Sequence, residues 1–281
     1  MTTHVVKVGS AEVIELLDMS FVLDHAILFP GRDQQEIMAY RDLYPQSYTS
    51  EGRYQTYASA YVIRSGGRTV LVDTGLGPRA PEWLGGAQGR LLDDMREKGV
   101  RPEDIDVVVC THLHIDHIGW NVQQEAGSPR PTFPRARYYL PKADWDYFTA
   151  PERIQQSGGG VTLLPLQQLG VLELFSGETT LAEGVSTMPT PGHTPGHTSI
   201  LIASQGERAL IAGDLANHPL QVDKTDWSSA FDTDAAQAAE TRRRVLDFLE
   251  REGVMVAFGH FPPPNLGRLI RWEGKRVFRA L

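Results

Sequence analysis

The stretch Thr111-His112-Leu113-His114-Ile115-Asp116-His117 places three imidazole groups and a carboxylate on one short segment. Because the chain holds only nine histidines in 281 residues, chance is a poor explanation for this cluster. Imidazole and carboxylate groups are the ligands that suit zinc and its first-row neighbours. The preceding run Ile105-Asp106-Val107-Val108-Val109-Cys110 is rich in β-branched residues and predicts a buried strand. Ligands at the end of such a strand have a rigid support, as a catalytic metal site requires.

Four other segments also end on ligand-type residues. Thr69-Val70-Leu71-Val72 leads into Asp73, and two further apolar runs end at Asp214 and His260. An alternating segment over residues 184–188 precedes Thr190-Pro191-Gly192-His193-Thr194-Pro195-Gly196-His197, in which two Pro-Gly pairs form a stiff turn. Since strand ends on one edge of a sheet bring their side chains together, we expect these residues to form one site.

The composition limits the class of protein. A net charge of −8 argues against a nucleic-acid-binding surface. The single cysteine, Cys110, precludes an internal disulfide, and its place in the predicted strand indicates a small core residue. The chain begins without an apolar run that would fit a signal peptide, and no stretch reaches membrane-spanning length, so we expect a cytoplasmic protein without a membrane partner.

The candidate ligands run from His112 to His260 and must meet, which favours one domain over residues 1–281. Hydrophobic patterns and turn residues predict the elements along the chain. They indicate hairpins over residues 5–17, 57–73 and 269–280, strands over residues 137–140, 171–175 and 198–203, and helices over residues 91–98, 142–147 and 234–252.

The motifs together resemble those of metallo-β-lactamase-fold hydrolases. The matching segments are Leu71-Val72-Asp73-Thr74-Gly75, the His112–His117 motif, the turn that carries His193, Gly213-Asp214 and Gly259-His260. They occur in the family's order and at compatible spacings. The resemblance implies an α+β fold, an αββα four-layer sandwich in which two mixed sheets pack face to face with helices outside.

The resemblance also implies a centre of two divalent metal ions, with zinc expected first and iron, manganese or cobalt as alternatives. One metal would be held by His112, His114 and His193, the other by Asp116, His117 and His260, and Asp214 would bridge them. A hydroxide shared by the two ions would then attack the substrate, and no side-chain nucleophile is needed. The chain agrees, since it has no Gly-x-Ser-x-Gly elbow.

Other residues have supporting roles by the same resemblance. Asp73 would hydrogen-bond a ligand histidine and fix its tautomer. His197 would start the next strand and bond to nearby backbone, while His218 is compatible with a pocket or a surface position. Asp116 and Asn217 are the expected catalytic residues. Asn217 stands where many related lactonases carry a tyrosine, so we expect its amide to contact the substrate's developing oxyanion.

The insertions should determine specificity. Residues 24–55 carry five aromatic side chains and are expected to form either a lid or packed core. The run Ser157-Gly158-Gly159-Gly160 predicts a flexible loop, and residues 215–232 carry Trp227 and Phe231. These segments predict an aromatic-lined pocket for a small molecule with an apolar acyl or aryl group.

The nearest-looking groups are quorum-quenching lactonases and methyl-parathion-hydrolase-like enzymes. We therefore expect a dinuclear metal-dependent hydrolase of a lactone or related ester. A phosphotriesterase with the same core is the alternative, and a thioesterase or a β-lactamase-like amidase fits less well. A redox or binding protein that uses the site without hydrolysis is the hypothesis from another class. A homodimer is compatible with the sequence.

Overall fold

The computed structural model describes residues 5–78, 82 and 86–281, and two mixed sheets of seven strands each form its centre. In spatial order, the first sheet contains β1 (Val5–Val8), β2 (Ala11–Leu23), β3 (Tyr54–Ser65), β4 (Arg68–Val72), β5 (Val107–Val109), β8 (Arg137–Pro141) and β9 (Leu172–Phe175). The second contains β10 (Thr180–Ala182), β11 (Val185–Pro189), β12 (Thr198–Ser204), β13 (Glu207–Ile211), β14 (Met255–Ala257), β15 (Leu266–Trp272) and β16 (Lys275–Ala280). A separate ribbon pairs β6 (Val122–Glu125) with β7 (Ser128–Pro131).

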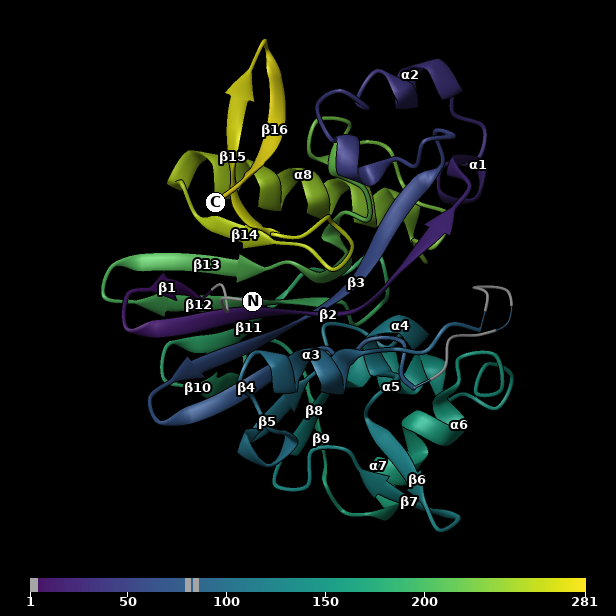
Figure 1. The fold of residues 1–281 in the computed structure, drawn as a ribbon, viewed down its shortest axis with the longest axis vertical. Coiled ribbons are helices and arrows are strands. Elements are labelled where there is room, and N and C mark those ends of the chain that lie inside the picture. Colours follow the sequence, from purple (N-terminus) through teal and green to yellow (C-terminus); the bar gives the residue numbers. More distant parts are fainter. Residues whose placement is uncertain (1–4, 79–81, 83–85) are drawn as a thin grey trace.

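Helices cover the outer faces of both sheets, so the predicted four-layer sandwich is confirmed (Figure 1). The long helix α8 (Ala235–Glu252) lies against the second sheet. The first sheet is covered by α3 (Leu91–Glu97), α5 (Lys142–Phe148) and α7 (Leu164–Gln168). Shorter helical segments are α1 (His25–Leu28), α2 (Gln34–Met38), α4 (Ile115–Ile118), α6 (Gly159–Thr162) and the 3₁₀ turns Pro45–Ser47, Pro102–Asp104, Gly213–Leu215 and Pro219–Val222. None of the described helices is long and apolar enough to cross a membrane.

Alternation along the strands decides which layer each side chain joins. On β4, Val70 packs between the sheets, whereas Leu71 belongs to the cluster under the outer helices. On β13, Ile211 packs between the sheets and Leu210 contacts the layer of α8. Each strand therefore contributes to two cores, and burying a side chain of this size is worth about 1.5–3 kcal/mol.

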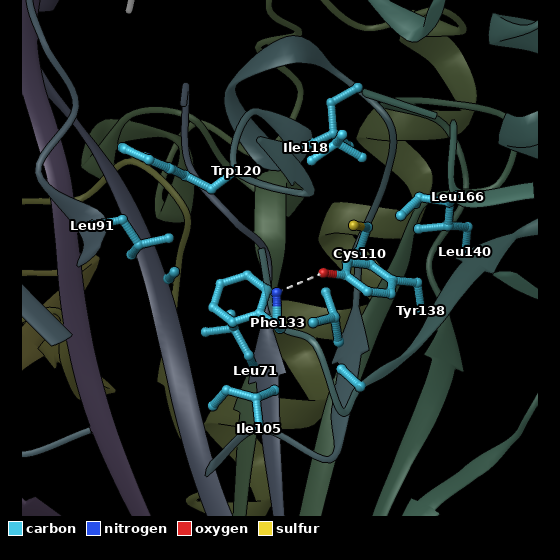
Figure 2. Close-up of a cluster of buried hydrophobic side chains, with 14 of the residues drawn as sticks. Leu71, Leu91, Ile105, Cys110, Ile118, Trp120, Phe133, Tyr138, Leu140 and Leu166 are labelled. Atoms are coloured by element: carbon cyan, nitrogen blue, oxygen red, sulfur yellow. Dashed lines mark hydrogen bonds between the residues drawn. The ribbon is translucent and has the colours of Figure 1, made fainter. Parts of the chain in front are cut away.

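The outer core of the first sheet contains the single cysteine (Figure 2). Cys110 is fully buried in it, and burial raises the pKa of its thiol well above the ordinary value. In the same cluster the phenol oxygen of Tyr138 accepts a hydrogen bond from the backbone N–H of Phe133 at 3.0 Å. The prediction that Cys110 is a small core residue is confirmed.

Residues 24–55 form packed core, which resolves the choice between lid and core. Their aromatic side chains are buried, and they pack with Trp227, Leu220 and Val277 in one cluster. Phe29 lies with its ring centroid 5.6 Å from that of Trp227. The segment contains α1 and α2 rather than a long loop, because these rings supply enough apolar surface to hold short helices in place.

The clearest predicted helix is present as α8. The Asp234 carboxylate caps it by accepting from the Gln237 N–H at 2.9 Å, and Gly253 ends it with a left-handed φ of 60°. The predicted flexible loop at residues 157–160 is wrong, since α6 begins at Gly159. The Ser157 hydroxyl stabilises that start, because it accepts the Gly159 N–H at 3.2 Å.

Candidate metal centre

The expected ligands meet at one edge of the sandwich, where several strands end. His112 and Asp214 follow β5 and β13, and His193 and His260 follow β11 and β14. The other three are His114, the N-cap residue of α4, and Asp116 and His117 within that helix. Their ligand atoms fall into three overlapping groups, each within 4.8 Å: His112, His114 and His193; His112, His117 and Asp214; Asp116, His117 and His260. The structure thus brings together all seven residues that the motifs indicated.

The first group consists of three imidazoles that converge on one point. His112 Nε2 lies 3.1 Å from His114 Nδ1, which lies 3.0 Å from His193 Nε2. Three nitrogens around a tetrahedral zinc ion would be about 3.3 Å apart, given zinc–nitrogen bonds of about 2.0–2.1 Å. Burial and the neighbouring His193 ring lower the pKa of His114 to about 3, so this ring is neutral and has a lone pair available.

The group of Asp116, His117 and His260 is more open to the solvent. His260 Nε2 lies 3.5 Å from Asp116 Oδ2, and His117 Nε2 lies 3.9 Å from Asp116 Oδ1. The side chain of Asp116 is 19% exposed, whereas those of the other two residues are 2% and 8% exposed. Asp116 therefore presents one carboxylate to both the histidines and the adjoining cavity.

Asp214 lies between the group of His112, His114 and His193 and the group of Asp116, His117 and His260. Its Oδ1 is 3.3 Å from His117 Nε2, and its Oδ2 is 3.3 Å from His193 Nε2 and 2.9 Å from His260 Nε2. Burial opposes ionisation of Asp214, but the His260 and His117 rings lower its pKa well below the ordinary value. An ionised carboxylate that faces both groups has the position required of a bridging ligand.

The donor set fits cations. His117 Nε2 and Asp214 Oδ1 are buried and have no hydrogen-bond partner among the described residues, although they lie only 3.3 Å apart. Burial opposes protonation of His117, but the Asp214 and Asp73 carboxylates raise its pKa well above the ordinary value. The position between these atoms therefore attracts positive charge, and a divalent ion there would displace a proton.

Three ligand rings are held by groups on their far side. His117 Nδ1 contacts Asp73 Oδ2 at 2.8 Å, His193 Nδ1 contacts Asp232 Oδ1 at 2.8 Å, and His260 Nδ1 contacts the Tyr57 carbonyl at 2.7 Å. Each contact places the Nδ1 proton and leaves Nε2 facing the site. The structure places Asp73 against a ligand histidine, as expected.

The sequence interpretation missed Asp232. Its carboxylate is fully buried and also pairs with the Arg242 guanidinium at 3.1 Å, and that side chain is only 1% exposed. Asp232 therefore connects the His193 ring to Arg242 on α8. The available signal was an aspartate before the helix start, but such a residue is equally typical of a helix cap.

Asp144 on α5 was also missed. Its Oδ2 accepts from the Leu113 N–H at 3.1 Å and the Thr194 hydroxyl at 2.7 Å, and its Oδ1 accepts from the Gly196 N–H at 2.5 Å. Burial raises the pKa of Asp144 to about 6. One carboxylate therefore joins the loop that carries His112 to the turn that carries His193.

His197 supports the bridging position rather than joining the ligands. Its Nδ1 contacts the Thr190 carbonyl at 2.9 Å, so Nε2 accepts the backbone N–H of Asp214 at 3.0 Å. Burial and the nearby His193 ring lower the pKa of His197 to about 3, which keeps the ring neutral. This agrees with the expectation that it bonds to nearby backbone.

Asn217 and His218 have different surroundings. Asn217 lines the cavity, and its Nδ2 donates to Asp214 Oδ2 at 2.7 Å, so its contact with the substrate's oxyanion stays a prediction. His218 is fully buried and packs with its ring centroid 4.5 Å from that of Tyr54, so neither a pocket nor a surface position is correct.

A cavity of about 420 Å³ opens onto the site. His114, Asp116, His193, Asp214 and His260 form its floor. Its walls are largely apolar and include Phe21, Leu23, Leu28, Leu76, Ile115, Tyr147, Phe148 and Phe231. Of the five aromatic residues in 24–55 only Tyr54 lines this cavity, and Trp227 does not, because the others pack into the core. The aromatic wall comes mainly from β2, α5 and Phe231.

Residues 53–260 match the metallo-beta-lactamase superfamily. The chain belongs to this superfamily. It is 25% identical over 216 residues to an N-acyl homoserine lactonase of Bacillus sp, a match that covers 71% of this chain and 79% of the relative. It is also 25% identical over 178 residues to the N-acyl homoserine lactonase AttM of Rhizobium radiobacter, covering 61% and 64% of the two chains.

Two solved structures share the fold over almost the whole length of this metallo-beta-lactamase-superfamily chain. The hydrolase AbOPH of the beta lactamase superfamily has a TM-score of 0.85 at 22% identity and covers 100% of this chain and 98% of its own. AidC, a dizinc quorum-quenching lactonase in complex with the product N-hexnoyl-L-homoserine, has a TM-score of 0.85 at 22% identity and covers 100% and 97%. Together with the clustered ligands, the family makes the chain a metal-dependent hydrolase.

Proposed function

We propose that the chain is a dinuclear metal-dependent hydrolase of lactones or related esters, with zinc as the expected metal. His112, His114 and His193 would hold one ion, Asp116, His117 and His260 the other, and Asp214 would bridge them. The observation that carries the proposal is the placement of the ionised Asp214 carboxylate within 3.3 Å of ring nitrogens from both groups. A shared carboxylate offsets the repulsion between two dications.

The protein's own groups prepare this centre. When bound, paired divalent ions lower the pKa of water to about 7 and polarise a carbonyl oxygen. Asp73, Asp232 and the Tyr57 carbonyl hold protons at Nδ1 of three ligand rings, which keeps each Nε2 free to coordinate. Asn217 orients the Asp214 carboxylate through its amide N–H. The largely apolar wall limits the water that can compete with the substrate.

The cavity supports a substrate with an apolar acyl or aryl group. Phe21, Leu23 and Phe148 are among its lining residues, and apolar side chains outnumber polar ones beyond the floor. Such a cavity binds the non-reacting part of a small substrate and leaves its carbonyl at the metals. The lactonase relatives agree with this choice of reaction.

A hydrolysis panel with defined metal loading tests the proposal. It would compare lactones, aryl esters, phosphotriesters, thioesters and β-lactams on the same preparation, with metal content measured in parallel. We expect two metal equivalents per chain and the highest kcat/KM on lactones or esters. Rapid turnover of phosphotriesters with inert lactones and esters would establish the alternative, and full activity at one metal equivalent would overturn the dinuclear mechanism.

Three features stay predictions of the sequence. They are the single-domain organisation over residues 1–281, the cytoplasmic location and the homodimer. The meeting of ligands from both sheets supports the first of these.

A further inference from the structure

Polar side chains in the cavity wall gather on one turn. Beyond the floor, Arg153, Gln156 and Ser157 lie close together in sequence, and most other lining residues are apolar. The Ser157 hydroxyl is occupied, because it donates to the Phe148 carbonyl at 3.0 Å. Among the described residues that line the cavity, Arg153 is the only lysine or arginine. This turn is therefore where the wall can recognise a polar group.

Arg153 is held by a run of ring contacts that begins at a ligand histidine. The His114 and Phe148 ring centroids are 5.4 Å apart, and those of Phe148 and Tyr147 are 5.0 Å apart. The Arg153 guanidinium lies over the Tyr147 ring, 4.1 Å from its centroid. Two ring contacts, from His114 through Phe148 to Tyr147, therefore lie between a candidate ligand and the guanidinium, which has a defined place over the Tyr147 ring.

Donors on this turn are available. The Arg153 guanidinium has five N–H donors, and its only hydrogen bond in the described part of the chain is from Nη1 to Glu152 Oε1 at 2.9 Å. The Gln156 amide has no side-chain partner among the described residues, and it follows Arg153 by three positions, on the same side of the turn. Two sets of donors consequently border an otherwise apolar wall.

We propose that Arg153 and Gln156 form a subsite for an uncharged carbonyl group at the far end of the substrate's apolar portion. This inference rests on the proposed function, because it describes the acyl part of the hydrolysed ester or lactone. Glu152 already supplies a countercharge to Arg153, and the chain carries a net charge of −8, so a carboxylate gains less than an amide or ketone here. The acyl chain would have to extend past the Phe148 and Tyr147 rings to reach these donors.

Matched esters test the subsite on the metal-loaded full chain. Three aryl esters of equal acyl length would end in a methyl group, a primary amide or a carboxylate. Arg153→Met should lower the amide-to-methyl ratio of kcat/KM about tenfold, which is the worth of a hydrogen bond from a charged donor. Gln156→Leu should lower the same ratio about threefold, in line with a neutral hydrogen bond. The kcat/KM of each variant for the methyl ester is the reference for that variant's own ratio.

Arg208→Met is the matched control. Arg208 also lies over an aromatic ring, 5.7 Å from the Phe248 centroid, and pairs with Glu252, but it is absent from the cavity lining. Its variant should leave every ratio unchanged. An unchanged ratio in Arg153→Met would overturn the subsite, and a wild-type preference for the carboxylate ester would overturn the choice of an uncharged group.

Failure of the proposed function gives a different result. If wild-type protein hydrolyses none of the esters, ester hydrolysis is the wrong reaction and the proposed function fails. Calorimetric binding of the free amide-ended and methyl-ended acids to the metal-loaded protein then still decides the subsite. A preference for the amide-ended acid that Arg153→Met abolishes supports it, and equal affinities overturn it.

Discussion

The floor and the wall of the cavity are built in different ways. The floor belongs to the candidate metal centre, in which His112, His117, His193 and Asp214 have side chains that are no more than 3% exposed. On the wall, Phe231 is 39% exposed and the Arg153 side chain 40% exposed. Errors of a few tenths of an ångström therefore matter on the floor, whereas exposed wall residues such as Phe231 and Arg153 can change with little cost to the fold.

The difference has a physical origin. His117, His193 and His260 each make one contact toward the site and another toward the protein, as His117 does with Asp214 and Asp73. A substitution there leaves a buried polar group without its partner, which is costly. A wall residue such as Phe231 offers mainly apolar area, and its replacement removes only part of that area. The floor should thus control kcat and metal content, and the wall should control KM.

The largest effect should follow from Asp214→Ala. This change removes the carboxylate that faces both groups, so nothing would offset the repulsion between the ions held with His193 and with His260. A loss of about 4 kcal/mol of transition-state stabilisation corresponds to a fall in kcat on the order of a thousandfold. Metal analysis should show less than two equivalents, with an unchanged far-ultraviolet circular dichroism spectrum. Wild-type kcat with full metal content would show that Asp214 does not bridge.

Next in size are the two carboxylates behind the ligand rings. Asp73→Asn should weaken the metal held with His117, and Asp232→Asn the metal held with His193, each by about 10–100-fold. Chelator competition on each variant measures the two affinities separately. Equal weakening of both metals in both variants would contradict the division into two groups.

The floor could be predicted from the sequence because its chemistry is local. His112, His114 and His117 announce a metal site by their spacing, and Asp73 and Asp214 stand directly after recognisable apolar strands. Asp144 and Asp232 gave no such signal. Each contacts its partner across tens of residues, and an aspartate on a helix or before one has ordinary explanations.

The wall could not be predicted for a related reason. The aromatic residues at 24–55 were candidates for the pocket. Tyr40, Tyr44 and Tyr48 instead pack into a core with β16 and residues 220–227. Their burial depends on which distant element covers them, and composition does not encode that. Tyr147 and Phe148, on the helix α5, were the better candidates, and only the fold places them beside His114.

Asp144 tests whether residues that are not candidate ligands control the floor. It contacts the loops that carry His112 and His193 but does not belong to either ligand group. Asp144→Asn exchanges one acceptor oxygen for an N–H donor and so loses a bond to Leu113, Thr194 or Gly196. We expect the affinity of the metal held with His193 to fall about tenfold, the worth of one hydrogen bond to a charged group. Chelator competition measures it.

The control for Asp144 lies two residues along the same helix. Asp146 is exposed and pairs with Lys142 at the surface, so Asp146→Asn should leave both metal affinities unchanged. If the two variants bind metal equally well, the contacts of Asp144 serve the fold alone.

A moderate effect is expected for Asn217→Ala, which separates orientation of the floor from contact with the substrate. The amide donates to Asp214 Oδ2 at 2.7 Å, and losing this bond should lower kcat about tenfold with little change in KM. Steady-state kinetics on one ester measures the split. An increase in KM with unchanged kcat would instead indicate that Asn217 binds the substrate directly.

The smallest effect belongs to the wall. Phe231 lines the cavity, yet 39% of it is exposed, so Phe231→Ala removes only part of an aromatic contact with the substrate. A loss of about 1 kcal/mol corresponds to roughly a fivefold rise in KM for an apolar ester, while kcat and metal content stay unchanged. Trp272→Ala is the control, because Trp272 is 58% exposed and lies outside the cavity lining. A fall in kcat or metal content in Phe231→Ala would show that wall and floor are coupled, and the division between them would then be wrong.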